Sequence, residues 1–272
     1  MKKYPVVLTI AGSDSVGGAG IQADIKAISA TGSYAASAIT AVTVQNTVGV
    51  RAVHNVPLDI VRGQIEAVVE DIGPDAVKIG MLSSVELVRT VAAALKELGL
   101  RNVVLDPVMV ATSGDRLLAE EAIAVLREEL LPLARVITPN VPEAEILAGE
   151  AIGSSEDLPR LARKLSCGGK VSVLMKAGHL EGEEELRDCF YNAEEDHAVE
   201  LRSRRVHTPN THGTGCTLSS AFASYLAQGL ALDDAARAAH KYLAEAIRSG
   251  SGYAIGHGHG PVNHFWKITD KN

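Results

Sequence analysis

The sequence predicts an α/β fold of three layers, α/β/α, in which a mostly parallel central sheet is covered by helices on both faces. Short apolar runs alternate with segments whose apolar residues recur at helical spacing, a rhythm typical of consecutive βα units. Most of these runs are nearly continuous Val, Ile and Leu, as expected for strands buried on both faces. No stretch is rich enough in Pro, Gly or Ser to act as a linker. We therefore expect residues 1–272 to form a single domain.

The expected elements alternate along the chain, and one segment departs from that order. Strands are predicted over residues 6–11, 37–44, 75–79, 102–106, 135–138 and 171–176. Helices are predicted over residues 20–31, 58–72, 84–98, 116–131, 142–149, 156–167, 216–229 and 233–249. The polar, acidic segment 183–205 predicts a small β-hairpin or flap, because two β-prone arms flank a turn. The short run 49–56 is either an edge strand or a flap.

Composition and charge argue against several classes of function. The formal net charge is −7 and aromatic residues make up 4% of the chain, which disfavours a nucleic-acid partner. No run approaches the ~18 apolar residues of a membrane span, and the N-terminus lacks the pattern of a secretory signal. The three widely spaced cysteines make neither a disulfide framework nor a zinc motif. We therefore expect a cytoplasmic protein whose ligands are small molecules.

The segment VVLTIAGSDSVGGAGIQADIKA, residues 6–27, joins a strand to a helix through a first glycine turn. Within it, residues 18–23 have the spacing G-x-G-x-x-A of a dinucleotide-binding turn. That function also needs an acidic residue about 20 positions further on, which binds a ribose hydroxyl. Residues 25–58 contain no Asp or Glu, and the second strand is followed by Gln45. The sequence therefore disfavours a dinucleotide site.

Asp24 stands in the helix that follows this turn. Ile21, Ile25 and Ile28 recur at helical spacing, and Asp24 lies at the edge of the stripe that they form, about 60° from Ile21. A half-buried carboxylate needs a hydrogen-bond donor. The donor is either an internal group, such as a nearby backbone N–H, or the amine of a bound ligand, and the helical pattern leaves both open.

Polar or glycine residues follow the predicted parallel strands. Ligands of open α/β sheets bind beyond the carboxyl ends of the strands. These ends carry Gly12, Ser13, Asp14, Gln45, Asn46, Gly80, Met81, Asp106, Val108, Met109, Asn140, Glu143, Lys176 and Gly178. Loops are usually polar, but six such ends at one edge of a sheet indicate a binding site rather than packing.

A second glycine turn, NTHGTGC at residues 210–216, opens the helix predicted over 216–229. Backbone N–H groups at a helix N-terminus form an anion site, although a plain capping turn has the same composition. The helix dipole supplies only about 0.3–1 kcal/mol, so the aligned N–H donors must provide most of the binding. Cys216 lies in the first turn of this helix, a position that lowers the pKa of a thiol. A lone cysteine is more often a small buried hydrophobe.

Other nucleotide and metal motifs are absent or weak. The run CGGKVS is no Walker A loop, because Lys164 stands where the first glycine is required. His257, His259 and His264 would allow a metal cluster near the C-terminus. Their glycine-rich surroundings, without a second type of ligand, favour a loop instead.

Together these segments resemble the bacterial hydroxymethylpyrimidine/phosphomethylpyrimidine kinases of thiamine biosynthesis, which belong to the ribokinase-like superfamily. The resemblance extends from residue 6 to residue 265 and rests on TIAGSDSVGGAGIQADIK, VQNT, KIGML, DPVM, ITPNVPEAE, LMKAGHL, NTHGTGCTLSSA and GHGPVNHF. It implies a ribokinase-like fold, ATP and Mg²⁺ as cofactors, and a homodimer. It also implies phosphorylation of 4-amino-5-hydroxymethyl-2-methylpyrimidine on its hydroxymethyl group, followed by phosphorylation of the monophosphate to the diphosphate.

The resemblance assigns binding residues to the substrate and to the cofactors. The pyrimidine pocket would be lined by Gly12, Asp24, Gln45, Met81 and Val108. Of these, Asp24 and Gln45 have the hydrogen-bonding chemistry for an aminopyrimidine edge, and the apolar pair would contact the ring faces. ATP would be bound by Asp106, Asn140, Lys176, Thr211, Gly213 and Gly215, and Mg²⁺ would be organised by Asp106 and Glu143.

The same resemblance implies that catalysis centres on the second glycine turn. Gly213, Thr214 and Gly215 would surround the transferring phosphoryl group, and Lys176 would neutralise phosphate charge. Cys216 would be the base on the substrate hydroxyl, at a position where relatives with sugar substrates usually have Asp.

Two other functions share parts of this pattern. A pyridoxal or pyridoxine kinase of the same fold is one alternative, because an aromatic-poor pocket could admit either ring and Cys216 could engage an aldehyde. A pyrimidine-binding regulator without catalysis is disfavoured by the presence of both Lys176 and the second glycine turn. Val16 stands where many relatives have Ser or Gly, and its branched side chain would alter how the first glycine turn closes over substrate.

Overall fold

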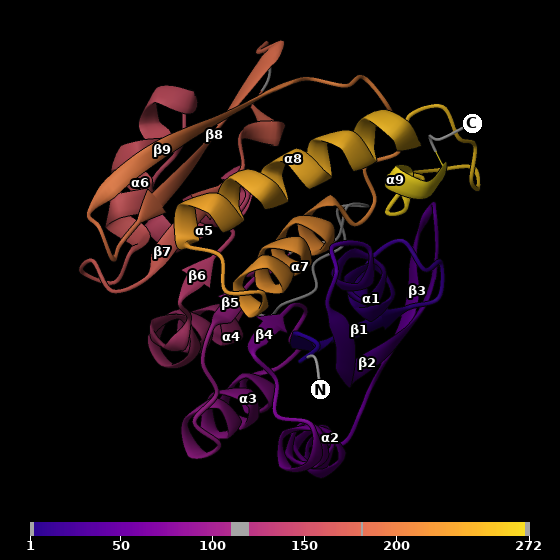
Figure 1. Cartoon of the computed structure of the whole chain (residues 1–272), viewed down its shortest axis with the longest axis vertical. Helices are drawn as coiled ribbons and strands as arrows, with labels where there is room; N and C mark the ends of the chain where they lie inside the picture. Colours follow the sequence, from indigo (N-terminus) through magenta and orange to yellow (C-terminus); the bar gives the residue numbers. More distant parts are fainter. Residues whose placement is uncertain (1–2, 110–119, 181, 270–272) are drawn as a thin grey trace.

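In the computed structural model, which describes residues 3–109, 120–180 and 182–269, a mixed sheet of nine strands organises the fold (Figure 1). The strands are β1 (Val6–Asp14), β2 (Tyr34–Asn46), β3 (Gly49–Asn55), β4 (Ala76–Ile79), β5 (Val103–Leu105), β6 (Val136–Ile137), β7 (Ser172–Met175), β8 (Glu185–Asn192) and β9 (His197–Arg204). They lie in the order β3-β2-β1-β4-β5-β6-β7-β8-β9.

The centre of the sheet is parallel and its two margins are antiparallel. The strands from β2 to β7 in the spatial order are mutually parallel. β3 pairs antiparallel with β2, which makes the run 49–56 an edge strand. The segment 183–205 forms the predicted hairpin, and β8 pairs antiparallel with β7. The predicted mostly parallel sheet is confirmed, and the hairpin extends it rather than standing apart.

Helices cover both faces of this sheet. They are α1 (Gly20–Ala30), α2 (Leu58–Asp71), α3 (Val85–Glu97), α4 (Glu120–Val125), α5 (Val141–Ala148), α6 (Leu158–Leu165), α7 (Thr214–Ala227), α8 (Leu232–Gly250) and α9 (Trp266–Thr269). Buried residues of α2 to α6 belong to the core on one face, and those of α1, α7 and α8 belong to the core on the other. The predicted helix 116–131 continues from α4 into a π-helical turn at Leu126–Leu130, and its first residues, 116–119, lie outside the described residues.

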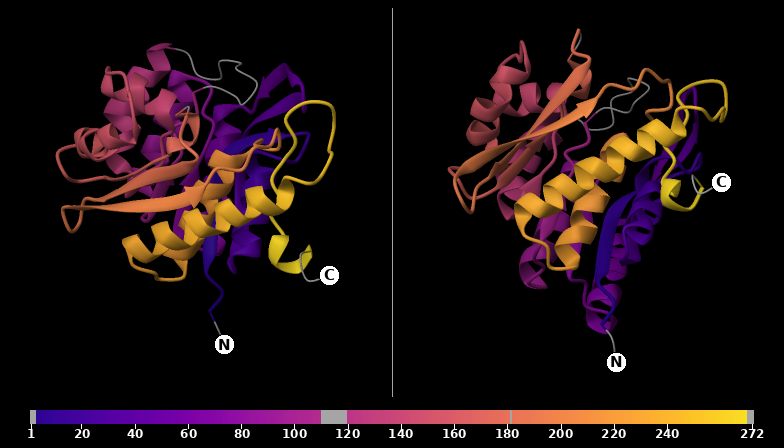
Figure 2. Two further views of the ribbon diagram at one scale, coloured as in Figure 1. Left: turned by 90° about the horizontal axis from the view of Figure 1, so that it is seen from above. Right: turned by 45° about the horizontal axis from the view of Figure 1, so that its top comes forward.

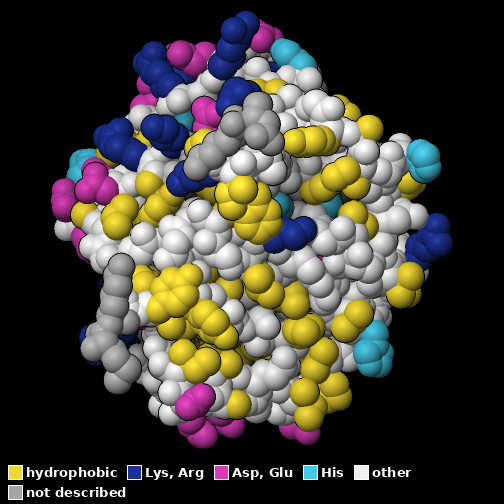
Figure 3. Space-filling model, turned by 45° about the vertical axis from the view of Figure 1, so that its right-hand side comes forward, with side chains coloured by type: hydrophobic (Ala, Val, Ile, Leu, Met, Phe, Trp, Pro, Cys, Tyr) yellow, Lys and Arg dark blue, Asp and Glu magenta, His cyan; other side chains and the backbone are white. Residues whose placement is uncertain are grey.

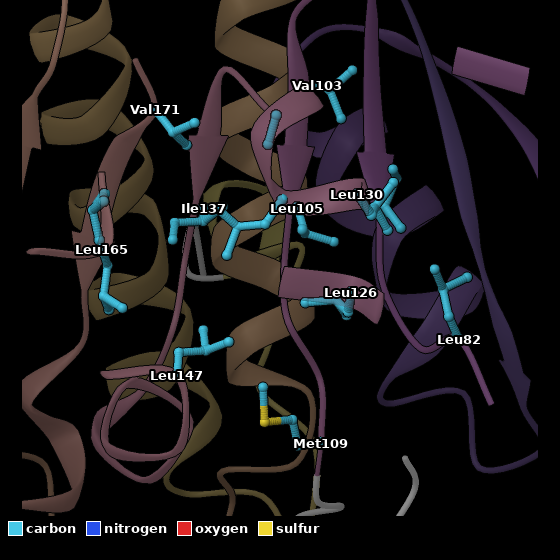
Figure 4. Packing of buried hydrophobic residues seen from close by; sticks show 14 of the residues in the cluster. Leu82, Val103, Leu105, Met109, Leu126, Leu130, Ile137, Leu147, Leu165 and Val171 are labelled. Atoms are coloured by element: carbon cyan, nitrogen blue, oxygen red, sulfur yellow. The ribbon is translucent and has the colours of Figure 1, made fainter. Parts of the chain in front are cut away.

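Successive side chains of a buried strand point to opposite faces of the sheet, so each strand contributes residues to both cores. In β4, Val77 and Ile79 join the core under α2 to α6, whereas Ala76 joins the core under α1 and α7. Figure 4 shows how strand residues such as Leu105 and Ile137 pack with helix residues in the first of these cores. Because every position is buried on one face or the other, the strands read as continuous apolar runs. Lys78 interrupts this pattern on the face that α1 and α7 cover.

The carboxyl ends of the parallel strands meet at one edge of the sheet. β1 runs beyond its predicted end to Asp14, with a shift in register between Ala11 and Ser13. Helix α7 begins at this edge, and α8 lies lengthwise beside the β8–β9 hairpin (Figure 2). No described helix is long and apolar enough to cross a membrane.

Candidate active site

A cavity of about 630 Å³ opens beyond the carboxyl ends of the strands. It is lined by all but one of the residues predicted for the site, namely Gly12, Gln45, Met81, Asp106, Val108, Asn140, Glu143, Lys176, Thr211, Gly213, Thr214, Gly215 and Cys216. The strand order gives the cavity two ends. One lies at the exits of β1, β2 and β4 and is called the β1–β2 end; the other lies at β7 and the hairpin and is called the β7–β9 end.

The β1–β2 end combines the thioether of Met81 with polar side chains, among them Thr43, Gln45 and His212. A Cβ atom on Gly12 would lie 2.7 Å from Met81 Cε, so a glycine is needed for the thioether to close against the strand. Gln45 contributes an amide whose Nε2 lies 3.5 Å from His212 Nε2. Val108 lines the same cavity. The arrangement suits a small, flat ligand with apolar faces and a hydrogen-bonding edge.

Asp24 does not line the cavity, which corrects the expectation that it binds a ligand. Its carboxylate is fully buried and accepts hydrogen bonds from Thr9 Oγ1 at 2.6 Å and Ser220 Oγ at 2.7 Å. Lys78 Nζ donates to both of its oxygens, at 2.8 and 2.9 Å. Because a carboxylate has about four acceptor positions, none remains for a ligand. The internal-partner interpretation is the one that the structure supports.

Lys78 is the buried counterion of Asp24, and sequence reasoning missed it. Its side chain is fully buried. Burial alone would lower the pKa of Lys78, but the charges of Asp24, Cys216 and Asp106 outweigh burial and raise it. The only signal in the sequence is a lysine inside an apolar strand, which requires a partner somewhere in the fold. That partner comes from α1, and the pair lies beneath α7.

The first glycine turn uses its backbone donors internally. Asp14 Oδ2 accepts the N–H groups of Gly18 at 3.1 Å and Ala19 at 2.9 Å, and Oδ1 accepts that of Val16 at 2.9 Å. Burial alone would raise the pKa of Asp14, but hydrogen bonds from His212 and the turn outweigh burial and lower it. The donors that a dinucleotide pyrophosphate would need are therefore occupied. The structure agrees with the sequence in disfavouring such a site.

The second glycine turn leaves part of its donors available. Among its described residues, the N–H groups of Asn210, Thr211, His212 and Thr214 have partners within the protein, whereas those of Gly213, Gly215 and Cys216 remain for a ligand. Helix α7 begins after Gly213, and no described side chain caps its N-terminus. Gly213 has φ +79°, and a Cβ atom there would lie 1.8 Å from the carbonyl oxygen of Gly18. Only glycine meets both demands. The first-turn N–H groups of α7 therefore point into the cavity edge as an anion site.

Cys216 lies in the first turn of α7, half-buried, and lines the cavity. The backbone N–H of Gly20 donates to its sulfur. Burial raises the pKa of the Cys216 thiol to about 11, and the nearby Lys78 ammonium opposes this rise without overcoming it. The expected lowering of the thiol pKa at a helix N-terminus is therefore wrong here, because desolvation exceeds the helix and ammonium effects.

Carboxylates and an ammonium meet beside α7. Lys176 Nζ donates to Asp106 Oδ1 at 3.2 Å, and a Cβ atom on Gly215 would lie within 3.3 Å of Lys176 Nζ. Glu143 completes a capping box with Asn140 at the start of α5. Burial raises the pKa of Glu143 to about 7. The charge of Lys176 opposes this rise, and the charge of Asp106 adds to it. Among described residues, no group of three or more His, Cys, Asp or Glu could hold a metal.

The β7–β9 end contains residues that sequence reasoning missed. Asp188 and His240 line the cavity, and Asp188 accepts the N–H of Ala177 at 2.7 Å, next to Lys176. Arg205 donates to three carbonyl oxygens of the 178–184 segment. These residues lie on the segment 183–205 and on α8, and no sequence pattern predicts that either element reaches the strand ends.

The glycine-rich tail supports the site from outside. Gly258 N donates to Thr47 Oγ1 at 3.2 Å, and His259 N donates to Thr47 O at 2.9 Å. His264 is buried with Nε2 3.0 Å from Thr217 Oγ1 of α7. Burial lowers the pKa of His264 to about 4. Among the described residues, these contacts make the tail a packing segment that joins the β2–β3 turn to α7.

The fold and the cavity define a class of protein. An α/β sheet with a ligand pocket at its strand ends, an uncapped helix N-terminus and an adjacent lysine has the parts that phosphoryl transfer requires. Residues 14–263 match the family model of phosphomethylpyrimidine kinase. The chain belongs to this family.

Individual relatives agree with this placement. The hydroxymethylpyrimidine/phosphomethylpyrimidine kinase of Rhizobium meliloti is 51% identical over 266 residues, which cover 96% of this chain and 98% of that protein. The crystal structure of phosphomethylpyrimidine kinase from Clostridium difficile is 45% identical with a TM-score of 0.77, covering 89% of this chain and 99% of that one. An ADP complex of Bacillus subtilis pyridoxal kinase is 36% identical with a TM-score of 0.87, covering 96% and 98%. The predicted ribokinase-like α/β fold is thereby confirmed.

Proposed function

We propose that this chain is an ATP-dependent kinase that phosphorylates 4-amino-5-hydroxymethyl-2-methylpyrimidine and then its monophosphate, in thiamine biosynthesis. The observation that carries the proposal is the position of the uncapped N-terminus of α7, between the small pocket at the β1–β2 end and Lys176. An acceptor and a phosphate donor bound at the two ends would meet at this helix. The relatives with the higher sequence identity act on the pyrimidine.

The pyrimidine binds at the β1–β2 end. Met81 and Val108 contact the faces of the ring, and the Gln45 amide offers one donor and one acceptor group to the aminopyrimidine edge. The buried Asp24–Lys78 pair supports this pocket from below without touching the ligand. The hydroxymethyl group then points toward Cys216 and the second glycine turn.

ATP binds toward the β7–β9 end with its terminal phosphate at α7. The N–H groups of Gly213 and Gly215 stabilise the charge on the transferring phosphoryl group, because they are fixed before the reaction begins. Thr214 holds the turn in shape, since its N–H donates to Thr211 O at 3.3 Å. Lys176 neutralises phosphate charge from the opposite side. The substrate oxygen attacks the γ-phosphorus, the bond to the β-phosphate oxygen breaks, and ADP leaves. The ADP complex of the B. subtilis relative supports a nucleotide in this fold.

Cys216 orients the substrate hydroxyl group, and its minor thiolate form accepts the hydroxyl proton. A thiol pKa of about 11 leaves little thiolate at neutral pH. In a loose phosphoryl-transfer transition state the hydroxyl proton need not be removed early, so positioning counts for more than base strength. Cys216 is suited to this role because it lies on the same helix turn that holds the phosphoryl group.

Mg²⁺ fits the donor set beside Lys176. Asp106, Asn140 and Glu143 offer oxygens of the hard type that Mg²⁺ prefers, and they are too few to enclose it, which leaves room for water and phosphate oxygens. Bound there, Mg²⁺ would neutralise phosphate charge. Asp106 is the better direct ligand, since the Glu143 carboxylate already serves the capping box with Asn140.

The test is ADP release from Mg·ATP with hydroxymethylpyrimidine, its monophosphate and pyridoxal as acceptors. Turnover with both pyrimidines and little with pyridoxal supports the proposal. Pyridoxal kinase is the second candidate, because the pyridoxal kinase structure has the higher TM-score, 0.87 against 0.77, although its sequence identity is lower. Turnover chiefly with pyridoxal would transfer the assignment to that activity and overturn the role of Gln45.

We also propose a homodimer formed through the β2–β3 edge. Val42 and Val44 project from one face of β2 and are 45% and 55% exposed. Figure 3, turned to bring the β3 side forward, shows exposed hydrophobic side chains across this side of the molecule. A sheet margin with an exposed apolar face, here formed by β2 beside the edge strand β3, suits two-fold pairing with a second copy. Light scattering should give the mass of a dimer for the wild type and of a monomer for Val42→Asp/Val44→Asp.

A reducing compartment, the cytoplasm, is the proposed location. Cys167, Cys189 and Cys216 are all free thiols in the structure. Cys216 must stay reduced for the role given to it above. Alkylation of all three cysteines in protein freshly released from cells would support the proposal.

A further inference from the structure

Asp14 and His212 connect the two glycine turns across 198 residues of sequence. His212 Nε2 lies 2.8 Å from Asp14 Oδ2, and both residues are less than 10% exposed. The carboxylate only accepts hydrogen bonds, so His212 carries a proton on Nε2 and donates it. Asp14 Oδ2 also accepts the N–H groups of Gly18 and Ala19, and Oδ1 accepts that of Val16, so four donors of the protein hold this carboxylate.

The His212 ring is held from several sides. Its backbone N–H donates to Gly260 O at 3.0 Å, which ties it to the tail. A Cβ atom on Gly18 would lie 2.5 Å from His212 Cδ2 and 2.9 Å from Pro261 Cβ, so the ring lies against Gly18. The next residue, Gly213, also lies against Gly18: a Cβ atom on Gly213 would lie 1.8 Å from the carbonyl oxygen of Gly18. The ring has one position, and that position determines where the second glycine turn begins.

The pair also joins the acceptor pocket to the anion site. Asp14 follows Gly12, which forms the wall of the pocket at the β1–β2 end, by two residues on β1. His212 precedes Gly213, the residue before α7. A displacement of His212 would therefore move the phosphate-binding N–H groups relative to the bound acceptor. Misplacement by about 1 Å can cost 10²-fold in rate, because the reacting atoms must approach in line.

We propose that Asp14 and His212 are a positioning pair that fixes the second glycine turn against the acceptor pocket and so governs the rate of transfer, not the affinity for the pyrimidine. This inference rests on the proposed kinase function. Both residues line the cavity, and His212 Nε2 lies 3.5 Å from Gln45 Nε2. The side chains assigned to the pyrimidine, Gln45, Met81 and Val108, are all retained when the pair is broken, so we expect its affinity to be largely kept.

The experiment compares His212→Asn with His212→Gln. The amide nitrogen of Gln reaches about as far as imidazole Nε2, whereas that of Asn reaches only as far as Nδ1. We expect His212→Asn to lower kcat by about 100-fold, with the Kd of the pyrimidine, measured by calorimetry, within about threefold of wild type. His212→Gln restores the donor to Asp14 and should recover most of the activity. His257→Asn, an exposed tail histidine, is the matched control and should leave kcat unchanged.

A second variant tests the pair without removing a hydrogen-bonding group. Gly18→Ala displaces the His212 ring, because the added Cβ atom overlaps Cδ2. It should lower kcat selectively, as His212→Asn does, and it keeps the test available if His212→Asn fails to fold. In a double-mutant cycle, Asp14→Asn with His212→Asn should be no slower than the slower single variant, because both break one interaction.

Several outcomes would overturn the proposal. They are wild-type kcat in both His212→Asn and Gly18→Ala, equal losses in His212→Asn and His212→Gln, or a loss of pyrimidine affinity that accounts for the lost activity. The kcat of each variant is divided by the kcat of the wild type, and both are measured with the acceptor that the wild type phosphorylates, either hydroxymethylpyrimidine or pyridoxal. A wild type that turns over only pyridoxal would therefore contradict the proposed substrate and leave the test of the pair intact.

Discussion

The two glycine turns of the cavity have similar compositions and differ in how they use the backbone N–H groups that precede a helix. In the first turn, the Asp14 carboxylate accepts the N–H groups of Val16, Gly18 and Ala19. In the second turn, no described side chain caps α7 after Gly213. A carboxylate of the protein holds the donors of the first turn, whereas in the second turn Thr214 N–H donates to Thr211 O and the N–H groups of Gly213 and Gly215 are left for an anion.

This difference shows what glycine spacing can and cannot predict. Glycines mark places where backbone must approach closely or take positive φ. They do not say whether the freed N–H groups meet a ligand or a neighbouring carboxylate. In the first turn the answer lies in Asp14, four residues before Gly18. The anion turn is the one that lacks such an acid.

The largest expected effect comes from Gly213→Ala, compared with Gly17→Ala. Both glycines have φ +79°, so the cost of strained backbone, about 1–2 kcal/mol, is the same. At Gly213 the new Cβ atom also overlaps Gly18 O, whereas at Gly17 the nearest atom is Lys26 Nζ, 3.5 Å away. We expect Gly213→Ala to lower kcat by at least about 100-fold and Gly17→Ala to change it little. Equal effects in turnover assays would show that the two turns are not interlocked.

The next effect is that of Cys216→Ala, which separates chemistry from binding in the second turn. A positioned proton acceptor contributes about 10²–10⁴-fold, and the small fraction of thiolate at neutral pH places the expected loss of kcat near the lower limit. The Kd of the pyrimidine should change by less than about threefold, since its other contacts remain. Steady-state turnover and calorimetry measure the two quantities. Cys167→Ala is the control, and wild-type turnover by Cys216→Ala would remove Cys216 from the mechanism.

Much of the fold and most of the site positions could be predicted from sequence. The buried parallel strands read as apolar runs, and the residues that follow them converge because parallel strands end at one edge. That rule placed Gln45, Asp106 and Lys176 at one cavity. The glycines of the second turn, which precede apolar residues at helical spacing, predicted that a helix begins there.

The remaining features depend on contacts between distant segments. Lys78 and Asp24 are 54 residues apart, and Ser220 is 196 residues from Asp24, so no local pattern showed that the carboxylate was already saturated. The pKa of Cys216 was misjudged because a helix N-terminus is visible in sequence and the depth of burial is not. The sequence likewise did not place the hairpin residue Asp188 beside Lys176.

A smaller effect is expected from His264, which supports the second turn from below. Burial holds the pKa of His264 near 4, below its ordinary value of 6.5, so its neutral form is the one that the fold stabilises. A depressed histidine pKa gives stability that is complete above pH 6.5 and is lost as pH falls toward 4. Relative to His264→Gln, the wild type should lose up to about 3 kcal/mol of unfolding free energy across this window. Urea unfolding at several pH values measures the difference, and parallel pH profiles would contradict the prediction.

The smallest effect concerns the buried pair beneath Cys216. Lys78→Met alone leaves an unpaired buried carboxylate, so the informative variant is Lys78→Met/Asp24→Asn, which removes both charges. Lys78 lowers the pKa of Cys216 by more than Asp24 raises it, so loss of both should raise the thiol pKa further. At a fixed pH the thiolate fraction then falls, and alkylation of Cys216 by iodoacetamide should slow several-fold, since one pKa unit is about tenfold. Mass spectrometry follows the alkylation of Cys216, with Cys167 as internal reference. An unchanged or faster rate of Cys216 alkylation would mean that the pair only packs against α7 and does not lower the thiol pKa.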